Sequence, residues 1–273
     1  MDEQLSGILA HFSLQARVFQ AGLLCQSASF DAAEGLGYIH VLRAGKLTIK
    51  NAGAKTIQLN EPSLLLHMKP TSHQLKPLSS GAELVCASFD FGKGMMNPLA
   101  KSLPNATVLK LNDAPSLNAS LQLLFSEAED KSLGLQSLLN RLMEVVIIQL
   151  IRELIEQKHL KIGILAGLAD PKLSKAIVAL HAEPARQWTL DELANIAGLS
   201  RTIFSNTFRE TVGDTPGHYL SEWRIGIAQS LLRKGKSLQL IADAIGYANT
   251  SALSRAFIAM TGLPPKRWKK QHD

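Results

Sequence analysis

The feature of this sequence that most constrains its fold is an internal repeat in the last third of the chain. Two segments match at an offset of 48 residues, which becomes 49 beyond a shared glycine. Such a repeat means that one supersecondary unit is used twice. The matching pairs are Leu190/Leu238, Leu193/Ile241, Ala194/Ala242 and Gly198/Gly246, followed by Phe208/Phe257, Gly213/Gly262, Pro216/Pro265 and Tyr219/Trp268.

The first copy carries the local signals of a helix-turn-helix. Thr189 is placed to cap a helix, and Glu192 occupies the capping-box position three residues later. Gly198 follows that helix as a residue that can adopt the left-handed conformation and make a sharp turn. Ser200 then caps a second helix. The residues of this second helix that are expected to face inward are Ile203, Phe204 and Phe208.

The second copy repeats the pattern. Ser237 caps its first helix and Gly246 makes the turn. Either Asn249 or Thr250 starts the second helix of this copy. The residues of that helix that are expected to be buried are Leu253 and Phe257.

The outward side chains of the second helix in each copy are short to medium in length and form hydrogen bonds, which suits a helix lying in the DNA major groove. A long helix predicted over 215–233 would hold the two copies in fixed relative positions. A separation near ~34 Å, one turn of DNA, would let one subunit enter two successive major grooves. The outward residues are Arg201, Thr202, Ser205, Asn206 and Arg209 in the first copy, and Asn249, Thr250, Ser251, Ala252 and Arg255 in the second.

The distribution of charge agrees with a polyanionic partner. From Asp170 to the C-terminus there are 14 Lys and Arg against 9 Asp and Glu, whereas the preceding residues have 15 against 14. The positive excess therefore lies in the segment that contains the repeat. Side chains that neutralise phosphates release condensed counterions, which favours nucleic-acid binding. Many basic domains have no such partner, so charge alone does not decide.

The N-terminal half has a different periodicity. From about residue 30 to residue 91, short alternating runs are separated by turn residues, which is typical of an antiparallel β barrel or sandwich. From residue 116 the period becomes helical, and the helix predicted over 135–157 is apolar on more than one face. Either its own domain or a second subunit must cover such a helix. A homodimer and an intramolecular core helix are therefore both compatible with the sequence.

The predicted fold class is α+β with two domains. An antiparallel β domain with linker and dimerisation helices occupies 1–160, and an all-α domain with two helix-turn-helix units occupies 170–273. Between them, 161–169 contains two glycines and is predicted to be a hinge-like linker. Asp170 before Pro171 predicts the start of the next helix.

Composition excludes several classes of protein. With 273 residues, 46% hydrophobic and 19% charged side chains, the chain can bury a sizeable core and is too apolar to be disordered. Cys25 and Cys86 form no zinc or disulfide pattern, which fits a reducing cytoplasm. The N-terminus has acidic residues where a signal peptide has basic ones. No apolar run approaches the roughly 20 residues that span a bilayer, so no membrane segment is expected.

The C-terminal motifs resemble the AraC family of bacterial transcription regulators, over Asp170 to Lys270. The run Leu168-Ala-Asp-Pro171, with His181-Ala-Glu-Pro184 and Trp188, resembles the subgroup of this family whose first domain is a cupin barrel, which agrees with the alternating β pattern. The motifs that carry the resemblance are Trp188-Thr-Leu-Asp-Glu-Leu-Ala194, Gly198-Leu-Ser-Arg201, Phe208-Arg-Glu210, Gly213, Pro216, Tyr219-Leu220, Trp223-Arg224, Ile241-Ala242, Gly246-Tyr247, Ser254-Arg-Ala-Phe257, Gly262 and Pro264-Pro265.

The resemblance implies roles for individual residues. Base contacts fall on Thr202, Ser205 and Asn206 in the first copy and on Thr250, Ser251 and Arg255 in the second, with Arg201 and Asn249 as further base-reading candidates. The short side chains at Thr202 and Ser205 depart from better-known members, so Arg201 and Asn206 are expected to carry a larger share. Contacts to DNA phosphates, which set register, are expected from Arg209, Lys236, Lys266 and Arg267, and Trp223 and Trp268 are expected to be core residues.

The cupin resemblance raises the question of a ligand in the β domain. Cupins often bind a metal through histidines and a glutamate, but Tyr38 stands where the first histidine of the usual pair would be, and no glutamate follows at the expected spacing. No metal or other cofactor is therefore predicted. The expected small-molecule pocket is lined by Tyr38, His40, His67 and His73.

The leading functional hypothesis is a sequence-specific, double-stranded DNA-binding regulator, controlled by a small molecule in the cupin-like domain. The resemblance implies RNA polymerase as a partner where such a regulator acts as an activator. A second hypothesis is a ligand-independent regulator whose β domain serves only dimerisation or partner binding. A third is a cupin metalloenzyme fused to a DNA-binding domain, although the sequence shows no convincing catalytic set and an enzyme is not expected.

Overall fold

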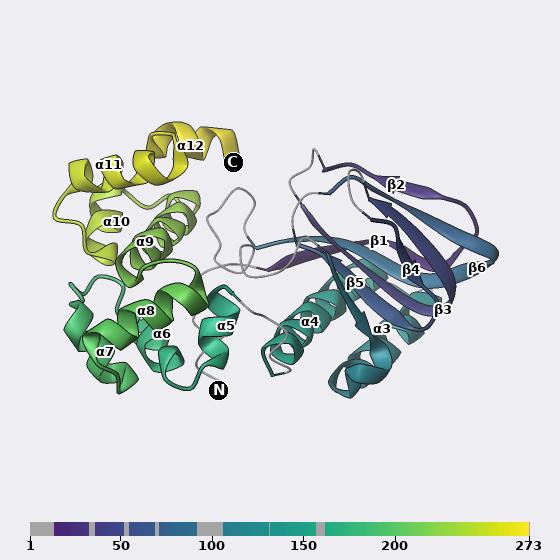
Figure 1. Cartoon of the computed structure of the whole chain (residues 1–273). Helices are drawn as coiled ribbons and strands as arrows, with labels where there is room; N and C mark the ends of the chain where they lie inside the picture. The colour runs from purple at the N-terminus through teal and green to yellow at the C-terminus, as the bar shows by residue number, and fades with distance from the viewer. Residues whose placement is uncertain are drawn as a thin grey trace. The chain divides into compact units, whose positions relative to one another are not determined.

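The computed structural model describes residues 14–32, 36–51, 55–68, 71–91, 106–130, 132–156 and 162–272. These residues form a β-rich unit, within 14–90 and 103–157, and a helical unit that contains the C-terminal part of the chain from residue 162 (Figure 1). The predicted domain boundary near residue 160 lies outside the described residues.

The β-rich unit is built on one antiparallel sheet, which confirms the β prediction for this half. The strand order is β1-β6-β3-β5-β7, with β2 paired to β6 and β4 paired to β3. Along the described strands the path runs from β1 to β7 without pairing back to its first strand, so the architecture is a cupin-like sheet and closure into a barrel is not observed. The strands are β1 Gln15–Leu24, β2 Ala28–Phe30, β3 Gly37–Asn51, β4 Ile57–Leu59, β5 Ser63–His67, β6 His73–Asp90 and β7 Thr107–Lys110.

Two long strands, β3 and β6, organise this sheet. They pair from Gly37 opposite Phe89 to Asn51 opposite His73, with irregularities in register on either side of Ala44. These irregularities let long strands bend over a core. Together with β4 and β5 they supply a core cluster made of Leu42, Leu47, Ile49, Leu59, Leu65, Leu75, Ala82, Leu84 and Cys86.

Two helices, α3 (Asn118–Glu129) and α4 (Leu135–Glu156), complete the β-rich unit and lie close to the predicted positions. Side chains of α4 bind the backbone of strand β1. The Val18 N–H donates to Asn140 Oδ1 at 2.8 Å, and Gln136 Nε2 donates to the Val18 carbonyl at 2.7 Å. These bonds cover the backbone groups of β1 that face away from β6, which protects an edge strand from pairing with another chain.

The helical unit consists of short helices, as the sequence predicts (Figure 1). Its core includes the aromatic residues Phe204, Phe208, Trp223, Phe257 and Trp268, which confirms that Trp223 and Trp268 are core residues. The helices are α5 Ile164–Ala169, α6 Leu173–Ala182, α7 Leu190–Ala197, α8 Arg201–Val212, α9 Pro216–Arg233, α10 Leu238–Ile245, α11 Thr250–Thr261 and α12 Pro265–His272.

Helix α5 occupies most of the segment that the sequence assigns to a linker, 161–169. Its residues 164–168 are buried, and the Gly163 N–H donates to the Thr211 carbonyl at 2.8 Å. Gly167 is needed for close packing, because a Cβ there would lie 2.7 Å from Ile177 Cδ1. The described part of this segment is therefore a packed element of the helical unit. Two glycines suggested a hinge from sequence, but one of them serves helix–helix contact.

The predicted caps of both helix-turn-helix units are present. Thr189 and Glu192 form the capping box of α7, and Ser200 and Ser237 accept hydrogen bonds from backbone N–H groups at the starts of α8 and α10. Gly198, Gly213, Gly246 and Gly262 all end their helices in the left-handed conformation. Asp170 Oδ1 accepts from the N–H groups of Lys172 and Leu173, just before α6 begins. One prediction is wrong, because Ile203 does not face inward and is 54% exposed.

Candidate nucleic-acid interface

Helix α8 of the first unit presents a polar face to solvent. Thr202, Asn206 and Arg209 are exposed, and Ser205 is half-buried. The opposite face is fixed by Phe204 and Phe208, which are fully buried. The turn at Gly198 and the cap at Ser200 set the direction in which this helix leaves α7. The side chains predicted to read bases are therefore placed together on one helix face.

Arg201 begins this face and has a partner within the unit. Its Nη1 lies 3.3 Å from Asp191 Oδ2 of α7, and both side chains are about two-thirds exposed. An ion pair between exposed groups is worth little, since each charge is well solvated. The Arg201 guanidinium can therefore exchange the carboxylate for a phosphate or a guanine edge at small cost.

Helix α11 of the second unit also presents a polar face to solvent, with other side chains than α8. Ser251 and Arg255 are exposed and Thr250 is half-buried. Asn249 has a structural role that the sequence only partly predicts: its Oδ1 accepts from the Ala252 N–H at 2.8 Å and caps the helix. Its amide nitrogen can still donate and the second lone pair of Oδ1 can still accept, so the cap leaves Asn249 able to contact a base edge.

The four predicted phosphate-binding residues are all exposed. Arg209 lies on α8, Lys236 follows α9, and Lys266 and Arg267 lie in the first turn of α12. They come from three different places along the helical unit. Cations placed in this way set register on a polyanion without reading its sequence.

The two helix-turn-helix units are joined by a buried arginine, Arg224, to which the sequence assigns no role. Arg224 of α9 is 8% exposed, its Nε donates to the Pro184 carbonyl at 2.6 Å, and its Nη2 donates to the Arg186 carbonyl at 2.9 Å. Its guanidinium also lies 5.8 Å from the centre of the Tyr247 ring. Arg224 therefore links the segment before α7, in the first unit, to the turn after α10, in the second.

A second set of contacts strengthens the same junction. Gln187 Nε2 donates to the Gly246 carbonyl at 2.9 Å, and a Cβ on Gly246 would lie only 2.2 Å from the Ala185 carbonyl oxygen. The turn of the second unit is thus in direct backbone contact with the segment that leads into the first unit. Together with the 18-residue helix α9, these contacts hold the units in one fixed relation.

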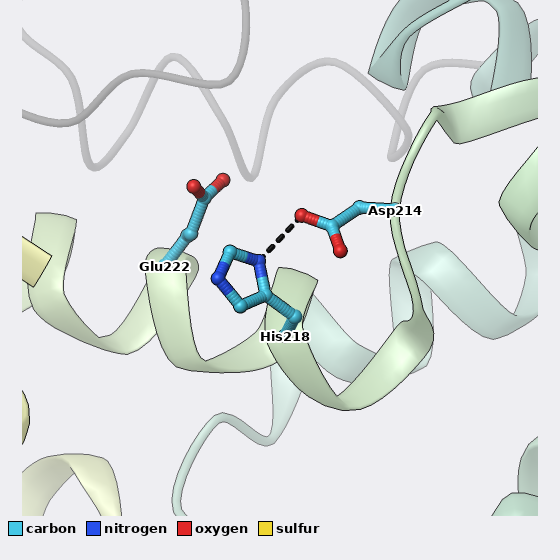
Figure 2. Close-up of side chains that lie close together, drawn as sticks. All are labelled: Asp214, His218 and Glu222. Atoms are coloured by element: carbon cyan, nitrogen blue, oxygen red, sulfur yellow. Dashed lines mark hydrogen bonds and ion pairs between the residues drawn. The ribbon is translucent and has the colours of Figure 1, made fainter.

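A cluster of ionisable side chains lies at the start of α9. The side-chain nitrogen and oxygen atoms of Asp214, His218 and Glu222 that could bind a metal ion all lie within 4.8 Å of one another (Figure 2). His218 Nδ1 pairs with Asp214 Oδ2 at 2.5 Å, and the Thr215 N–H donates to Asp214 Oδ1 at 2.7 Å. These bonds already give Asp214 a role in shaping the N-terminus of the helix.

In the β-rich unit, the predicted pocket residues Tyr38, His40, His67 and His73 do lie together. All four are at least 96% buried, and the ring centres of His73 lie 5.0 Å from His40 and 4.6 Å from His67. Phe30 stacks on His73 with a centroid distance of 4.9 Å. The rings pack against one another, which sequence spacing alone could not predict.

The histidines have a proton arrangement that follows from their contacts. His73 Nδ1 lies 2.7 Å from the Thr71 carbonyl, so it must donate, and neutral His73 then accepts at Nε2. His40 Nε2, 2.8 Å away, therefore donates to His73, and His40 Nδ1 accepts from the Cys86 thiol at 3.0 Å. A chain of hydrogen bonds runs from Cys86 through His40 and His73 to Thr71.

The ionisation of these groups agrees with that chain. Burial, followed by the neighbouring His73 and His67, holds the pKa of His40 well below its ordinary value. Burial also lowers the pKa of His73 and raises the pKa of the Cys86 thiol. Both histidines are therefore neutral near pH 7 and the thiol is protonated, which is the state that the hydrogen bonds require.

This chain does not fit the metal that many cupins carry. A metal needs a histidine lone pair, but both ring nitrogens of His40 and of His73 are used in hydrogen bonds within the cluster. No group of three ligand-type residues converges in the described part of the β-rich unit. In this structure His40 and His73 are therefore engaged with each other, with Cys86 and with Thr71.

A groove in the β-rich unit was missed by the sequence analysis. It has a volume of about 290 Å³ and lies between α3 and Arg43 of β3, with Phe125 and Glu129 in its lining. The Arg43 guanidinium lies 4.8 Å from the centre of the Phe125 ring and pairs with Glu83 and Glu129. Arg43 is one of several basic residues in its half, and no local motif marks it.

The two folded units and the exposed polar faces of α8 and α11 define a two-domain protein of the helix-turn-helix class. Residues 3–156 match the family model described as Cupin, and residues 193–271 match the model described as Helix-turn-helix domain. The chain belongs to the AraC-type regulators with an N-terminal cupin domain. Within the described residues, no helix is long and apolar enough to cross a membrane.

Similar proteins carry names that agree with this family. A "Putative AraC-like transcription regulator" of Streptomyces lividans is 34% identical over 68% of this chain, and the chain spans only 63% of the length of that relative. A protein of the same description from Streptomyces antibioticus is 29% identical over 88% of this chain and 89% of its own length. An AraC-type DNA-binding domain structure from Chromobacterium violaceum is 26% identical, with a TM-score of 0.35, over 37% of this chain and 92% of that one.

Proposed function

We propose that this protein is a sequence-specific DNA-binding transcription regulator in which one subunit reads two successive major grooves. The observation that carries the proposal is the pair of exposed polar faces on α8 and α11, each positioned by a side-chain cap, Ser200 or Asn249, and by a left-handed glycine before it. The proposed base readers are Arg201, Thr202, Ser205, Asn206, Asn249, Thr250, Ser251 and Arg255, and the proposed phosphate contacts are Arg209, Lys236, Lys266 and Arg267.

The junction around Arg224 supports the idea that both units act together. Two recognition helices in a fixed relation match DNA only when their half-sites are separated by the corresponding distance. The separation expected for one face of B-DNA is about 10 base pairs. Specificity then comes from each half-site and from the spacing between them.

The experiment that tests this proposal is selection of bound sequences from random duplex DNA with the full chain, at two salt concentrations. The proposal predicts an enriched motif with two half-sites about one helical turn apart. Binding should weaken as salt rises, because phosphate contacts release counterions. Salt-sensitive binding with no enriched motif would contradict sequence-specific recognition.

We also propose that a small molecule acts on the β-rich unit. Two places are candidates: the buried ring cluster of Tyr38, His40, His67 and His73, and the groove between α3 and Arg43. The groove already has the open volume that a small ligand needs, whereas the rings of the cluster would have to move apart. Thermal-shift screening of the wild-type chain, Phe125→Ala and His73→Phe separates these sites, because a bound ligand stabilises only proteins with an intact site.

Other features of the assembly follow from the family and are proposals for this chain. A cytoplasmic regulator of this kind would use RNA polymerase as its partner when it activates transcription. Leu138 and Val145 of α4 are more than one-third exposed, which supports a homodimer through this helix. If none of the small molecules tested changed the dimerisation of the protein or its affinity for DNA, the ligand-independent hypothesis would be supported instead.

A further inference from the structure

Ile203 is an exposed apolar residue on α8, the recognition helix of the first unit. It is the third residue of α8 and is 54% exposed, while its neighbours on the exposed face are polar. The apolar side of the helix is already supplied by Phe204, Phe208 and Val212, all buried. The fold of this unit therefore does not need an isoleucine at this position.

Elementary physical chemistry disfavours isoleucine there in the isolated protein. A β-branched side chain has a lower helix propensity than arginine, lysine, glutamine or glutamate, each of which could stand at an exposed helix position. An exposed isoleucine also leaves apolar surface in water, whose burial against a partner would be favourable. A contact with something apolar outside the protein would account for both costs.

The position of Ile203 indicates what that partner is. Ile203 precedes Asn206 by three residues, so the two side chains are neighbours on the helix surface. Asn206 is a proposed base reader, and a residue beside it faces the same groove. The major-groove edges of the four base pairs display one apolar group, the C5 methyl of thymine.

We infer that Ile203 contacts a thymine methyl group and makes the first half-site selective for thymine at one position. This inference rests on the proposed function and adds one base to the expected operator. The position that matches Ile203 in the second unit, at an offset of 49, is Ala252. Alanine reaches less far, so methyl recognition should be stronger in the first half-site than in the second.

The test replaces thymine by deoxyuridine, which removes only the methyl group. Using the operator obtained by selection, each thymine of the first half-site is replaced in turn, and binding is measured for the wild type and for Ile203→Ala. At one thymine the wild type should lose about fourfold in affinity, the factor expected for one buried methyl group. Ile203→Ala should lose nothing further at that position.

Two variants serve as controls. Ile203→Val keeps an apolar branched side chain and should retain most of the sensitivity to deoxyuridine. Ile258→Ala removes another exposed isoleucine, 43% exposed near the C-terminal end of α11, and should keep the full sensitivity. Because Ile203 is exposed, its replacement is expected to leave the folded state intact, and thermal unfolding of the variant checks this.

The outcomes separate the two claims. Two results would overturn this inference but not the proposed function. In the first, binding is sequence-specific but replacing thymine by deoxyuridine changes the affinity at no position. In the second, the loss of affinity caused by deoxyuridine is the same in Ile203→Ala as in the wild type. The second of these results would point to the methyl of Thr202. Absence of any sequence-specific binding overturns the proposed function, and the inference with it.

Discussion

The two helix-turn-helix units have the same plan but use corresponding residues differently. In the first unit a Cβ added at Gly198 would lie in open space, whereas one added at the matching Gly246 would overlap the Ala185 carbonyl. In the first unit the exposed face of α8 carries Asn206, whereas the matching position on the exposed face of α11, at the offset of 49, is Arg255. A repeated sequence pattern thus specifies the shape of both units, and the contacts between them decide what each residue contributes.

The largest expected difference is between the two turn glycines. Gly198→Ala should cost about 1–2 kcal/mol, because only the left-handed conformation is penalised. Gly246→Ala should cost roughly 1–3 kcal/mol more, since its Cβ would overlap the Ala185 carbonyl 2.2 Å away. Chemical denaturation of the two variants measures this difference. Equal losses of stability would show that the junction between the units does not form.

The next prediction concerns the arginine that joins the units. Arg224→Met removes hydrogen bonds to two carbonyls, at a cost of roughly 2–3 kcal/mol in the free energy of unfolding. It should also broaden the spacing between half-sites that the protein accepts. Arg233→Met is the matched control, because Arg233 ends the same helix and lies against Trp268 in the second unit. An unchanged spacing preference in Arg224→Met would contradict the positioning role.

The two asparagines should differ in what they contribute to stability. Asn206→Ala should weaken specific DNA binding by roughly 1–3 kcal/mol and relax one base preference, with little change in the melting temperature. Asn249→Ala should lower stability by about 1 kcal/mol, because the helix loses its cap. Binding titrations and thermal unfolding on both variants make the comparison. If Asn206→Ala lost stability and kept its base preference, the assignment of the reading face would be wrong.

The smallest expected effect is on a phosphate contact. Lys266→Ala should weaken binding to all sequences alike and reduce the slope of log affinity against log salt by about one. Titrations of a specific and a random duplex at several salt concentrations measure both quantities. A loss confined to the specific duplex would instead place Lys266 on a base.

Much of the helical unit could be predicted from sequence because its signals are local. The capping box at Thr189, the serine caps and the four left-handed glycines each depend on a few neighbouring residues, and all are present. The sequence predicts that the adjacent residues Ile203 and Phe204 both face inward, but only Phe204 is buried. Helical periodicity alone does not decide which of two adjacent apolar residues is buried. The junction at Arg224 depends on carbonyls some 40 residues away in sequence, which no local pattern encodes.

The β-rich unit was less predictable. Strand β1 falls outside the alternating stretch, and its backbone partners Asn140 and Gln136 lie more than 100 residues away. The sequence predicts that His40 and His73 line one pocket, and the structure places their rings next to each other. The direction of each hydrogen bond between them depends on the Thr71 carbonyl, whose position only the fold determines.

The most direct test of the central claim measures affinity for operators in which the distance between the two half-sites is varied one base pair at a time. The account predicts a sharp maximum near 10 base pairs and a large loss when half a turn is inserted, because the two units are held in one fixed relation. Affinity that does not depend on the spacing would contradict it, since each unit would then bind DNA independently.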